Sequence, residues 1–286
     1  SMQNTETEIK KTERLIRLAT YQGEDRVVPA EELIRELESK NRTGLKLNSS
    51  IPTLDKLVEG FRKGNLVVLS APTGHGKTTF FKTLTKNFTE NGQKSIWFSY
   101  EVPADEFYAT FPSGNKFFTM PRELSSGLLS WIEERILESK AKYNTNLVFI
   151  DHLHFLISMK ELAITKNQSI LIGMILRELK KIALANDMII FLVAHMRKKD
   201  TEEEIPSIDD LRDSSFVAQE ADVVMLLWRK QVERTREDKK NKIPPEWTNE
   251  AVLSVVKNRR TGKLGHLALE YNFNKNEFLE YSGFQV

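Results

Sequence analysis

The stretch that decides the fold of this chain reads Ala71-Pro72-Thr73-Gly74-His75-Gly76-Lys77-Thr78-Thr79. It follows an apolar run at 66–69 and leads into a helix-compatible segment at 80–87. Strand, tight loop, Gly-Lys-Thr and helix is the layout of a phosphate-binding P-loop. The sequence therefore predicts a nucleotide site in an α/β domain.

Each residue type in this loop has a physical role. Gly74 and Gly76 allow successive backbone N–H groups to turn inward as an anion nest, and the helix N-terminus adds positive potential at the same point. Lys77 is expected to reach the β- and γ-phosphates, and the Thr78 hydroxyl to coordinate Mg²⁺. Ala71 departs from the usual pattern, which has glycine at the first position.

Apolar strand candidates alternate with helical stretches over most of the chain. The expected strands are 66–70, 95–99, 147–151, 188–194, 222–228, 251–257 and 266–271, and the expected helices lie near 77–91, 123–140 and 167–186. This alternation predicts a largely parallel sheet covered by helices on both faces. The later strands lack intervening helices, so we expect an antiparallel edge at the C-terminal end.

The N-terminal part reads differently from the rest. Residues 1–25 are polar and expected to be mobile, whereas Pro29–Lys40 carries Leu33, Ile34 and Leu37 at helical spacing. This short amphipathic helix either packs on its own domain or docks onto a neighbouring subunit. We therefore expect a flexible segment and linker helix over 1–44, followed by one domain over 45–286.

Residues 229–246 form the clearest insertion in the domain. Over 229–242, seven basic side chains face only three acidic ones, and Ile243-Pro244-Pro245 follows. A charge run of this kind is usually a solvated connector. A loop that contacts nucleic acid is the alternative interpretation.

Composition limits the class of protein. The chain has 286 residues, 42 basic and 40 acidic, for a formal net charge of +2, and it contains no cysteine. The charge balance neither requires nor forbids a nucleic-acid partner, and the lack of cysteine excludes disulfides and thiolate zinc sites. No apolar run is long enough for a membrane span. We expect an intracellular, cytoplasmic protein, with a mitochondrial or viral-host setting left open.

Three other strands end in polar side chains. Asp151 ends the apolar strand 147–151, as in a Walker B element, where the carboxylate completes the Mg²⁺ site with the P-loop threonine. Glu101 follows the strand after the P-loop helix and is the candidate general base for the attacking water. His195 ends the strand 188–194 and could bond to the γ-phosphate and report its loss. In an open α/β sheet such strand ends meet in the ligand crevice.

His152 and His154 form an H-x-H pair beside Asp151, and His195 could lie nearby. Spacing by two would place both side chains on one face of a strand. The Mg²⁺–nucleotide site already accounts for the neighbouring carboxylate, and the sequence offers no further ligand cluster. We therefore expect no metal ligation by these histidines.

Taken in order, the strand ends read Gly-Lys-Thr, Ser-Tyr-Glu, Ile-Asp-His-Leu-His and Val-Ala-His. They are followed by Asp210-Leu211-Arg212-Asp213-Ser214 and by Val255-Val256-Lys257-Asn258-Arg259-Arg260-Thr261-Gly262. This series resembles the RecA-like ATPase domain of DnaB-type ring helicases, including Twinkle and the phage primase-helicases. The likeness extends over roughly 45–280. It implies a RecA-like P-loop core that hydrolyses ATP with Mg²⁺.

The resemblance also implies roles for individual residues. Lys77 and Thr78 hold phosphate and Mg²⁺, Asp151 completes the metal shell, Glu101 activates water, and His195 senses the γ-phosphate. Arg259, with Lys257, matches the finger that one subunit inserts into its neighbour's nucleotide site. The alternative for this pair is an ordinary basic strand edge.

In the family, loops after the Walker B and sensor strands face a central channel and track single-stranded DNA. The matching loops here lie at about 158–166, 197–209 and 212–216. The DNA-binding candidates are Lys160, Arg197, Lys198, Lys199 and Arg212. Their contacts would go to phosphates rather than bases. The implied partners are single-stranded DNA, further copies of the chain in a ring, expected to be a hexamer, and primase or other replication proteins.

Several features depart from the family pattern. The stretch between Glu101 and Asp151 is short, Glu202–Glu204 places three acids in a channel loop, and the basic insertion at 229–246 has no counterpart. The leading hypothesis is a helicase motor that translocates on single-stranded DNA. One alternative is a RecA- or KaiC-like ATPase that assembles or regulates without unwinding. Another is a loader or adaptor that binds nucleotide with little turnover.

Overall fold

The computed structural model of the protein describes residues 2–39, 46–114, 116–126, 128–157, 167–197 and 204–281. The chain divides into two compact units, Ser1–Leu45 and Lys46–Val286. The first unit holds two helices, α1 (Met2–Ala19) and α2 (Ala30–Ser39), and neither has a buried residue. The α2 helix matches the expected amphipathic helix. The α1 helix forms where the sequence predicted a mobile segment, with the i,i+4 ion pair between Lys10 and Glu6 on its surface.

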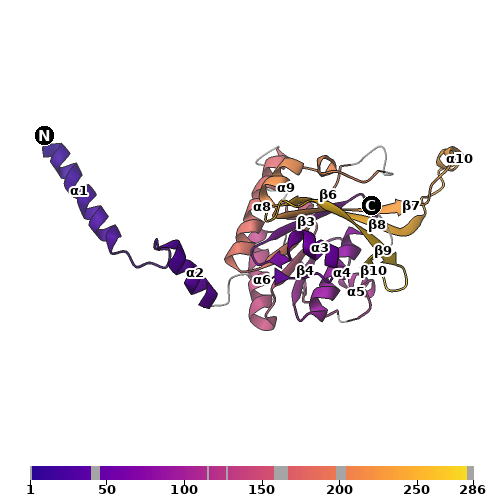
Figure 1. Ribbon diagram of the computed structural model, residues 1–286, viewed down its shortest axis with the longest axis horizontal. Coiled ribbons are helices and arrows are strands. Elements are labelled where there is room, and N and C mark those ends of the chain that lie inside the picture. Colours follow the sequence, from indigo (N-terminus) through magenta and orange to yellow (C-terminus); the bar gives the residue numbers. More distant parts are fainter. Residues whose placement is uncertain are drawn as a thin grey trace. The chain divides into compact units, whose positions relative to one another are not determined.

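The second unit is built on one mixed sheet of eight strands in the order β10-β9-β8-β7-β3-β6-β5-β4 (Figure 1). The strands are β3 (Leu66–Ala71), β4 (Ser95–Ser99), β5 (Leu147–Asp151), β6 (Ile189–His195), β7 (Val223–Gln231), β8 (Trp247–Asn258), β9 (Gly265–Asn272) and β10 (Glu277–Glu280). A separate antiparallel pair joins β1 (Lys46–Leu47) and β2 (Phe61–Arg62). The predicted alternation of strands and helices therefore gives the expected α/β fold.

The sheet has a parallel half and an antiparallel half. Strands β4, β5, β6, β3 and β7 pair in parallel, whereas β8, β9 and β10 continue the sheet in antiparallel pairing. The antiparallel C-terminal edge is thus confirmed. Because parallel strands all end at the same edge, the residues that follow β3, β4, β5 and β6 gather there.

Helices cover both faces of this sheet. On one face lie α3 (Pro52–Val58), α4 (Lys77–Glu90) and α5 (Ala104–Ala109), and on the other lie α6 (Leu129–Tyr143), α8 (Gln168–Ala185) and α9 (Ser214–Glu220). Alternate residues of β3 enter the two cores, with Val67 and Leu69 on the α4 side and Leu66 and Val68 on the α8 side. This period of two, with both sides apolar, is why parallel strands read as continuous hydrophobic runs.

Aromatic rings fill the core under α4. The Phe149 and Phe191 rings stack with centroids 4.7 Å apart, and Trp97 stacks on Phe149 at 5.0 Å. Phe81 of α4 meets both phenylalanines edge-on. Close-packed interiors resist displacement, so this layer fixes the helix that begins at the P-loop against the strands.

The insertion at 229–246 is more ordered than the sequence predicted. Strand β7 runs on to Gln231, a short helix α10 (Arg236–Lys240) follows, and β8 begins at Trp247. Thr235 caps α10, since its side chain accepts from the Asp238 amide while Asp238 accepts from the Thr235 amide. The expected helix 123–140 also begins later than predicted, at Leu129. Among the described helices, none has the length and apolar character that crossing a membrane requires.

Candidate functional site

The P-loop joins β3 to α4 through two left-handed glycines. Gly74 has φ 81° and Gly76 has φ 95°, a region that L side chains rarely adopt. A Cβ on Gly76 would also lie 3.0 Å from the ring of Phe278. Gly76 is the N-cap of α4, so the loop presents the helix N-terminus to the crevice. The geometry suits a phosphate group, as the sequence predicted.

His75 ties this loop to the end of β7 that pairs with the antiparallel strand β8. Its side chain is fully buried, and its Nδ1 accepts a hydrogen bond of 2.9 Å from the backbone N–H of Arg229. Burial, together with the cations of Arg229 and Lys77, lowers the pKa of His75 to about 4. Arg229 lies in turn against the rings of Tyr271, Trp247 and Phe273. A neutral, anchored His75 therefore holds the loop in place.

Thr78 and Asp151 form the centre of the site. The Thr78 hydroxyl donates to Asp151 Oδ2 across 2.6 Å, and Asp151 is 1% exposed. The pKa of Asp151 is raised to about 6, because burial and the Glu101 charge outweigh the opposing effects of Thr78, Lys77 and Lys82. The other oxygen, Oδ1, is buried and has no hydrogen-bond partner among the described residues. A hydroxyl beside an unsatisfied carboxylate oxygen fits Mg²⁺, which prefers oxygen ligands and bound water.

Glu101 and His195 lie beside this pair. Glu101 Oε1 is 3.3 Å from His152 Nε2, and its side chain is 39% exposed. Burial lowers the pKa of His195, Lys77 lowers it further, and Glu101 opposes the shift. The structure thus brings Lys77, Glu101, Asp151 and His195 into electrostatic contact around one crevice. Their individual roles remain predictions.

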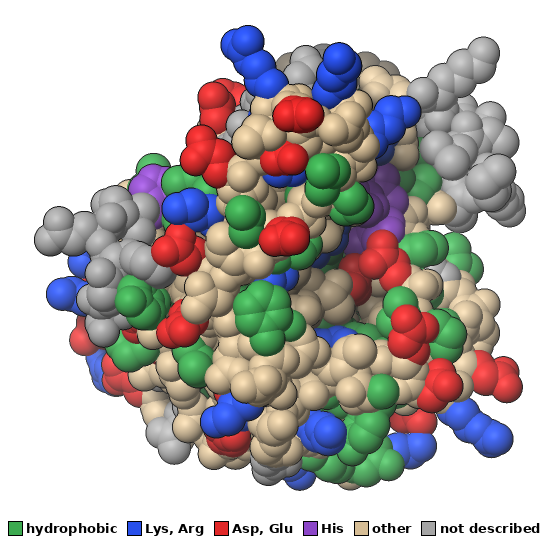
Figure 2. Space-filling view, turned by 90° about the vertical axis from the view of Figure 1, so that its right-hand side faces the viewer, with side chains coloured by type: hydrophobic (Ala, Val, Ile, Leu, Met, Phe, Trp, Pro, Cys, Tyr) green, Lys and Arg blue, Asp and Glu red, His purple; other side chains and the backbone are tan. Residues whose placement is uncertain are grey.

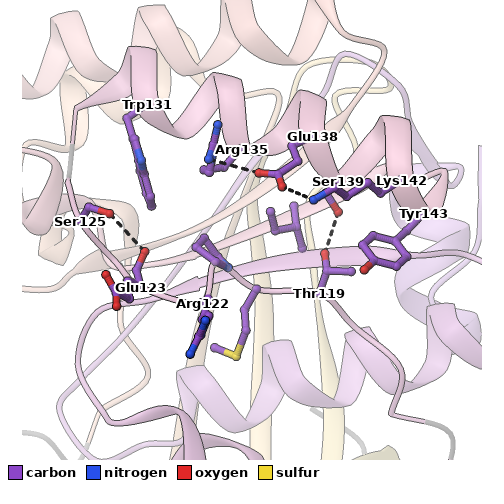
Figure 3. Close-up of a pocket in the computed structure, with 13 residues that line it drawn as sticks. Thr119, Arg122, Glu123, Ser125, Trp131, Arg135, Glu138, Ser139, Lys142 and Tyr143 are labelled. Atoms are coloured by element: carbon purple, nitrogen blue, oxygen red, sulfur yellow. Dashed lines mark hydrogen bonds and ion pairs between the residues drawn. The ribbon is translucent and has the colours of Figure 1, made fainter.

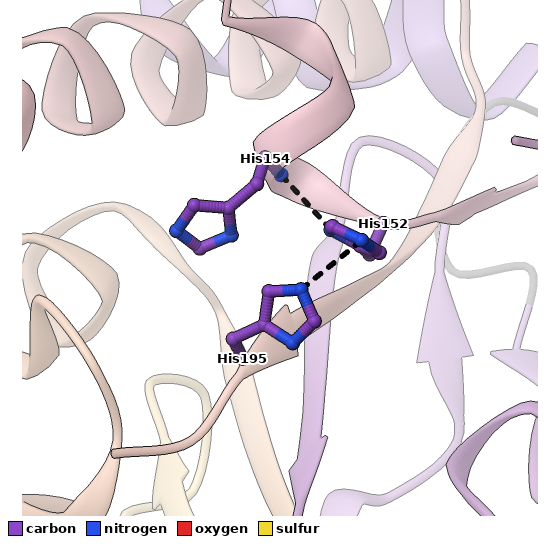
Figure 4. Close-up of side chains that lie close together, drawn as sticks. All are labelled: His152, His154 and His195. Atoms are coloured by element: carbon purple, nitrogen blue, oxygen red, sulfur yellow. Dashed lines mark hydrogen bonds between the residues drawn. The ribbon is translucent and has the colours of Figure 1, made fainter. Parts of the chain in front are cut away.

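The three histidines that the sequence placed near one another form a cluster. His152, His154 and His195 offer ring nitrogens that all lie within 4.8 Å of one another (Figure 4). The residues after Asp151 do not continue as a strand, because Leu153–Leu156 forms a 3-10 helix. The H-x-H pair therefore does not lie on one strand face, and His195 lies beside it as the sequence suggested, while the expectation of no metal ligation stays a prediction. The signal was present in the sequence, since His195 ends the strand adjacent to β5.

One residue that the sequence did not single out is Lys82. It lies on α4, is 4% exposed, and its Nζ donates to Phe107 O at 2.9 Å and Thr110 Oγ1 at 2.6 Å. Burial lowers the pKa of Lys82 to about 8, while Asp151 and Glu106 oppose the shift. These bonds tie α4 to α5, so Lys82 is best described as a support of the site.

Strand β6, which ends at the sensor candidate His195, is joined directly to a loop that is a candidate for DNA binding. Met196 and Leu211 form an antiparallel bridge, and the Arg212 amide donates to His195 O at 3.3 Å. The Arg212 guanidinium donates to Gln168 at 3.2 Å, and Arg197 is exposed on the facing segment. The other DNA-binding candidates, Lys160, Lys198 and Lys199, lie outside the described residues.

The finger candidates lie at the opposite edge of the parallel strands. Asn258, between Lys257 and Arg259, pairs with Val223 at the start of β7, and Val223 pairs with Val67. Arg259 donates to Asp222 at 3.1 Å and to Gln219 O at 2.7 Å, and its side chain is 44% exposed. Lys257 donates to Ala218 O.

This edge is separated from the P-loop by the length of β3. Val67 precedes Ala71 by four residues, which span roughly 13 Å of strand. Arg259 and Lys257 therefore belong to a different region of the domain from the P-loop of their own chain.

The surface offers two further features. A cavity of about 570 Å³ lies between α6 and the segment 119–125, lined by residues such as Arg122, Trp131 and Arg135 (Figure 3). No predicted site residue lines it. On the face that Figure 2 shows, acidic and basic side chains are interspersed and histidines line a recess.

Three comparisons with known proteins agree with one another. The sequence profile of the DnaB-like helicase C terminal domain matches residues 46–116 and 122–280. The replicative DNA helicase DnaB of Mycoplasma genitalium is 25% identical over 272 residues, covering 82% of this chain and 57% of that protein. Replicative DNA helicase DnaB of Helicobacter pylori is 26% identical over 294 residues, covering 87% and 59%. The chain thus spans less than two thirds of the length of these relatives.

Solved structures give the same fold. A chain described as an ATPase domain superposes with a TM-score of 0.69 at 20% identity, covering 90% of this chain and all of that one. A DnaB-like replicative helicase, described with its interactions with primase, gives a TM-score of 0.66 at 20% identity and covers 95% and 71%. Identities at this level establish the fold alone.

Proposed function

The chain belongs to the DnaB-like helicase C-terminal domain family, and from this premise we propose that it is an ATP-driven motor that translocates on single-stranded DNA during replication. The observation that carries the proposal is the meeting of Lys77, Thr78, Asp151 and Glu101 at the carboxyl edge of the parallel strands. ATP hydrolysis needs a phosphate cradle, a metal site and a base, and these residues supply all three.

At the reaction centre each residue has one task. Lys77 neutralises the β- and γ-phosphates, and Thr78 with Asp151 holds the metal ion. Mg²⁺ bound there would neutralise the charge that develops on the γ-phosphoryl oxygens. Glu101 orients the attacking water and accepts its proton, and its exposed carboxylate can reach that water.

The link from His195 to Arg212 supports coupling between nucleotide and DNA. His195 touches the crevice through its ring and holds the Arg212 amide through its carbonyl. Loss of the γ-phosphate would change the hydrogen-bond partners of the His195 ring. A movement of His195 would then be transmitted to Arg212 through the hydrogen bond between their backbones. Arg197 and Arg212, with Lys160, Lys198 and Lys199, would contact DNA phosphates, so binding should weaken steeply with salt.

The position of Arg259 supports a ring of subunits. It is exposed, and the length of β3 separates its edge from the P-loop of its own chain. We propose that Arg259, positioned with Lys257, completes the site of the adjoining subunit in a hexamer. An arginine supplied in trans is worth about 10³–10⁵ in rate. An association with primase is a further proposal, suggested by the DnaB-like relative described with it.

The decisive experiment mixes two inactive variants. Glu101→Gln keeps the finger and loses the base, whereas Arg259→Ala keeps the base and loses the finger. If the finger acts in trans, mixed assemblies recover Mg²⁺–ATP turnover, because an Arg259→Ala site receives the arginine of a Glu101→Gln neighbour. Turnover should also rise when single-stranded DNA is added at low salt.

Arg260→Ala is the matched control, since Arg260 is the exposed neighbour of Arg259 and has no assigned role. It should hydrolyse ATP like the wild type. A mixture no more active than its parts would contradict the finger in trans. Turnover that ignores single-stranded DNA would contradict the motor and favour an ATPase that assembles or regulates without unwinding.

A further inference from the structure

Of the three clustered histidines, only His195 has a role in the proposed ATP hydrolysis, and His152 and His154 have none. His195 is the last residue of β6, His152 follows β5, and His154 lies in the 3-10 helix beside them. Their rings face a common space (Figure 4). His152 Nε2 lies 3.0 Å from His195 Nε2, and the His152 and His195 ring centroids are 3.9 Å apart. Two nitrogens bound to one tetrahedral zinc ion at 2.0–2.1 Å would be about 3.4 Å apart.

The third ring has free coordinating atoms. Both Nδ1 and Nε2 of His154 are buried and have no hydrogen-bond partner among the described residues. Buried polar atoms without partners are rare in folded proteins, and a missing ion is one recognised explanation. The ligand nitrogens of the three histidines lie within 4.8 Å of one another. Rotation of the His154 ring can bring its nitrogen closer to the other two, and this rotation breaks no hydrogen bond of the ring.

Coordination would require one rearrangement at His152. Its Nδ1 accepts a 3.2 Å hydrogen bond from the His154 amide, so the neutral ring carries its proton on Nε2. Binding an ion through Nε2 moves that proton to Nδ1 and gives up two hydrogen bonds, the one from the His154 amide and the 3.0 Å bond between His152 Nε2 and His195 Nε2. Coordinate bonds from both rings replace them, and no proton leaves the His152 ring.

Glu101 can supply a fourth ligand. Its Oε1 lies 3.3 Å from His152 Nε2, and its side chain is 39% exposed. Three imidazoles and one carboxylate suit zinc and similar divalent transition metals. Mg²⁺ prefers an all-oxygen shell, so it remains at Thr78 and Asp151. The two metal sites are chemically distinct although they are adjacent.

We propose that His152, His154 and His195 bind a divalent transition-metal ion such as Zn²⁺, with Glu101 completing the shell, and that this ion inhibits ATP turnover. Inhibition follows because the ion occupies the residues proposed as base and γ-phosphate sensor. Only this second half rests on the proposed function. Metal binding itself does not depend on it.

The test of binding uses Co²⁺, whose visible absorption reports nitrogen ligands directly. Tag-free protein with Mg²⁺ and without nucleotide should bind one equivalent and give a d–d spectrum. His154→Ala should weaken the affinity at least about 100-fold, since even the loss of an outer-sphere partner costs 10–100-fold. His266→Ala is the matched control, an exposed histidine bonded to Ser254 away from the cluster, and should bind like the wild type. Thr78→Ala should also keep the spectrum, which separates this site from the Mg²⁺ site.

A second variant, His154→Gln, also removes the imidazole ligand, and circular dichroism of both variants checks that they are folded. Absence of a stoichiometric spectrum, or unchanged affinity in both His154 variants, would overturn the site. The second measurement adds Zn²⁺ to Mg²⁺–ATP turnover. Wild-type and His266→Ala activity should fall at the zinc concentration that displaces Co²⁺, while His154→Ala activity persists. Binding without inhibition would overturn the inhibitory role, and a chain without any turnover would count against the proposed function but not against the metal site.

Discussion

The parallel and antiparallel halves of the sheet divide the work of this domain. The parallel half ends in the chemical groups, Lys77, Glu101, Asp151 and His195, at one edge. The antiparallel half carries none of these groups, yet it touches the P-loop and α4 from the side. The difference teaches that the reacting groups and the contacts that hold them can come from separate parts of one sheet.

Four contacts carry this support, counting that of Arg229 at the end of β7 that pairs with β8. The Arg229 amide holds His75, the Phe278 ring fills the space beside Gly76, and Glu277 pairs with Lys86 of α4 at 2.6 Å. Phe278 also donates its backbone N–H to Thr83 at 3.1 Å. Substitutions in the parallel edge should therefore affect turnover more than stability, and substitutions in the antiparallel half should do the reverse.

Glu101→Gln should give the largest effect. Removal of a general base costs about 10²–10⁴ in rate, whereas the exposed side chain contributes little to folding. Steady-state ATP turnover and urea unfolding would be measured on the same protein, with nucleotide affinity by calorimetry. Turnover should collapse while affinity and the unfolding midpoint stay near wild type. A variant that loses stability as well would break the division between the two halves.

Glu277→Ala should show the opposite behaviour. Glu277 and Lys86 side chains are 3% and 14% exposed, and removal of one partner from a buried ion pair costs about 3–5 kcal/mol. Denaturant unfolding measures the loss. The matched control is Glu138→Ala, which breaks an ion pair of the same 2.6 Å length to Lys142 on the surface. Exposed helical pairs are worth about 0.3–0.5 kcal/mol, so equal losses in the two variants would contradict the prediction.

Much of this architecture could be predicted from the sequence, and the physical reason is periodicity. Strands buried on both faces appear as short apolar runs, and each run ends where a polar residue meets the crevice, as at Asp151. The supports could not be predicted in this way. His75 and Arg229 are 154 residues apart in the chain, and no local pattern pairs them. The short strand β10 was missed because Glu277–Glu280 lacks an apolar run.

The geometry of the histidine cluster could not be predicted from local sequence patterns either. His152 and His154 were visible as a pair, but their spacing was interpreted on a strand. The chain turns into a 3-10 helix at Leu153, and the pairing of β5 with β6 then brings His195 beside them. A residue pattern gives candidates, whereas the ligand set depends on which strands are neighbours.

His75→Asn should reveal the link between the halves through pH. The folded pKa of His75 is about 4, below its ordinary value near 6.5, so the unfolded chain binds this proton first as pH falls. The contribution of His75 to stability is therefore complete above pH 6.5 and is lost as pH falls towards 4. The variant keeps an acceptor for the Arg229 amide but does not titrate. Between pH 6.5 and 4 its unfolding free energy should fall less than that of the wild type, by about 2–3 kcal/mol. Other histidines titrate in both proteins, so parallel curves would contradict the proposed anchoring.

Asp151→Asn should give the smallest change in free energy and the most informative sign. The folded pKa of Asp151 is about 6, above its ordinary 3.8, because burial disfavours the charge. The folded state therefore holds this proton more tightly, and ionisation makes Asp151 destabilising as pH rises through 6. Asparagine avoids that cost, so in Mg²⁺-free buffer the stability of the variant relative to the wild type should rise by about 2 kcal/mol between pH 4 and pH 8. Urea unfolding at both pH values measures the difference, and turnover should be lost throughout. A variant less stable than the wild type at pH 8 would mean that the hydrogen bond from Thr78 outweighs the desolvation cost of the Asp151 carboxylate. The ionised carboxylate would then stabilise the fold, and metal binding would not be needed to offset its burial.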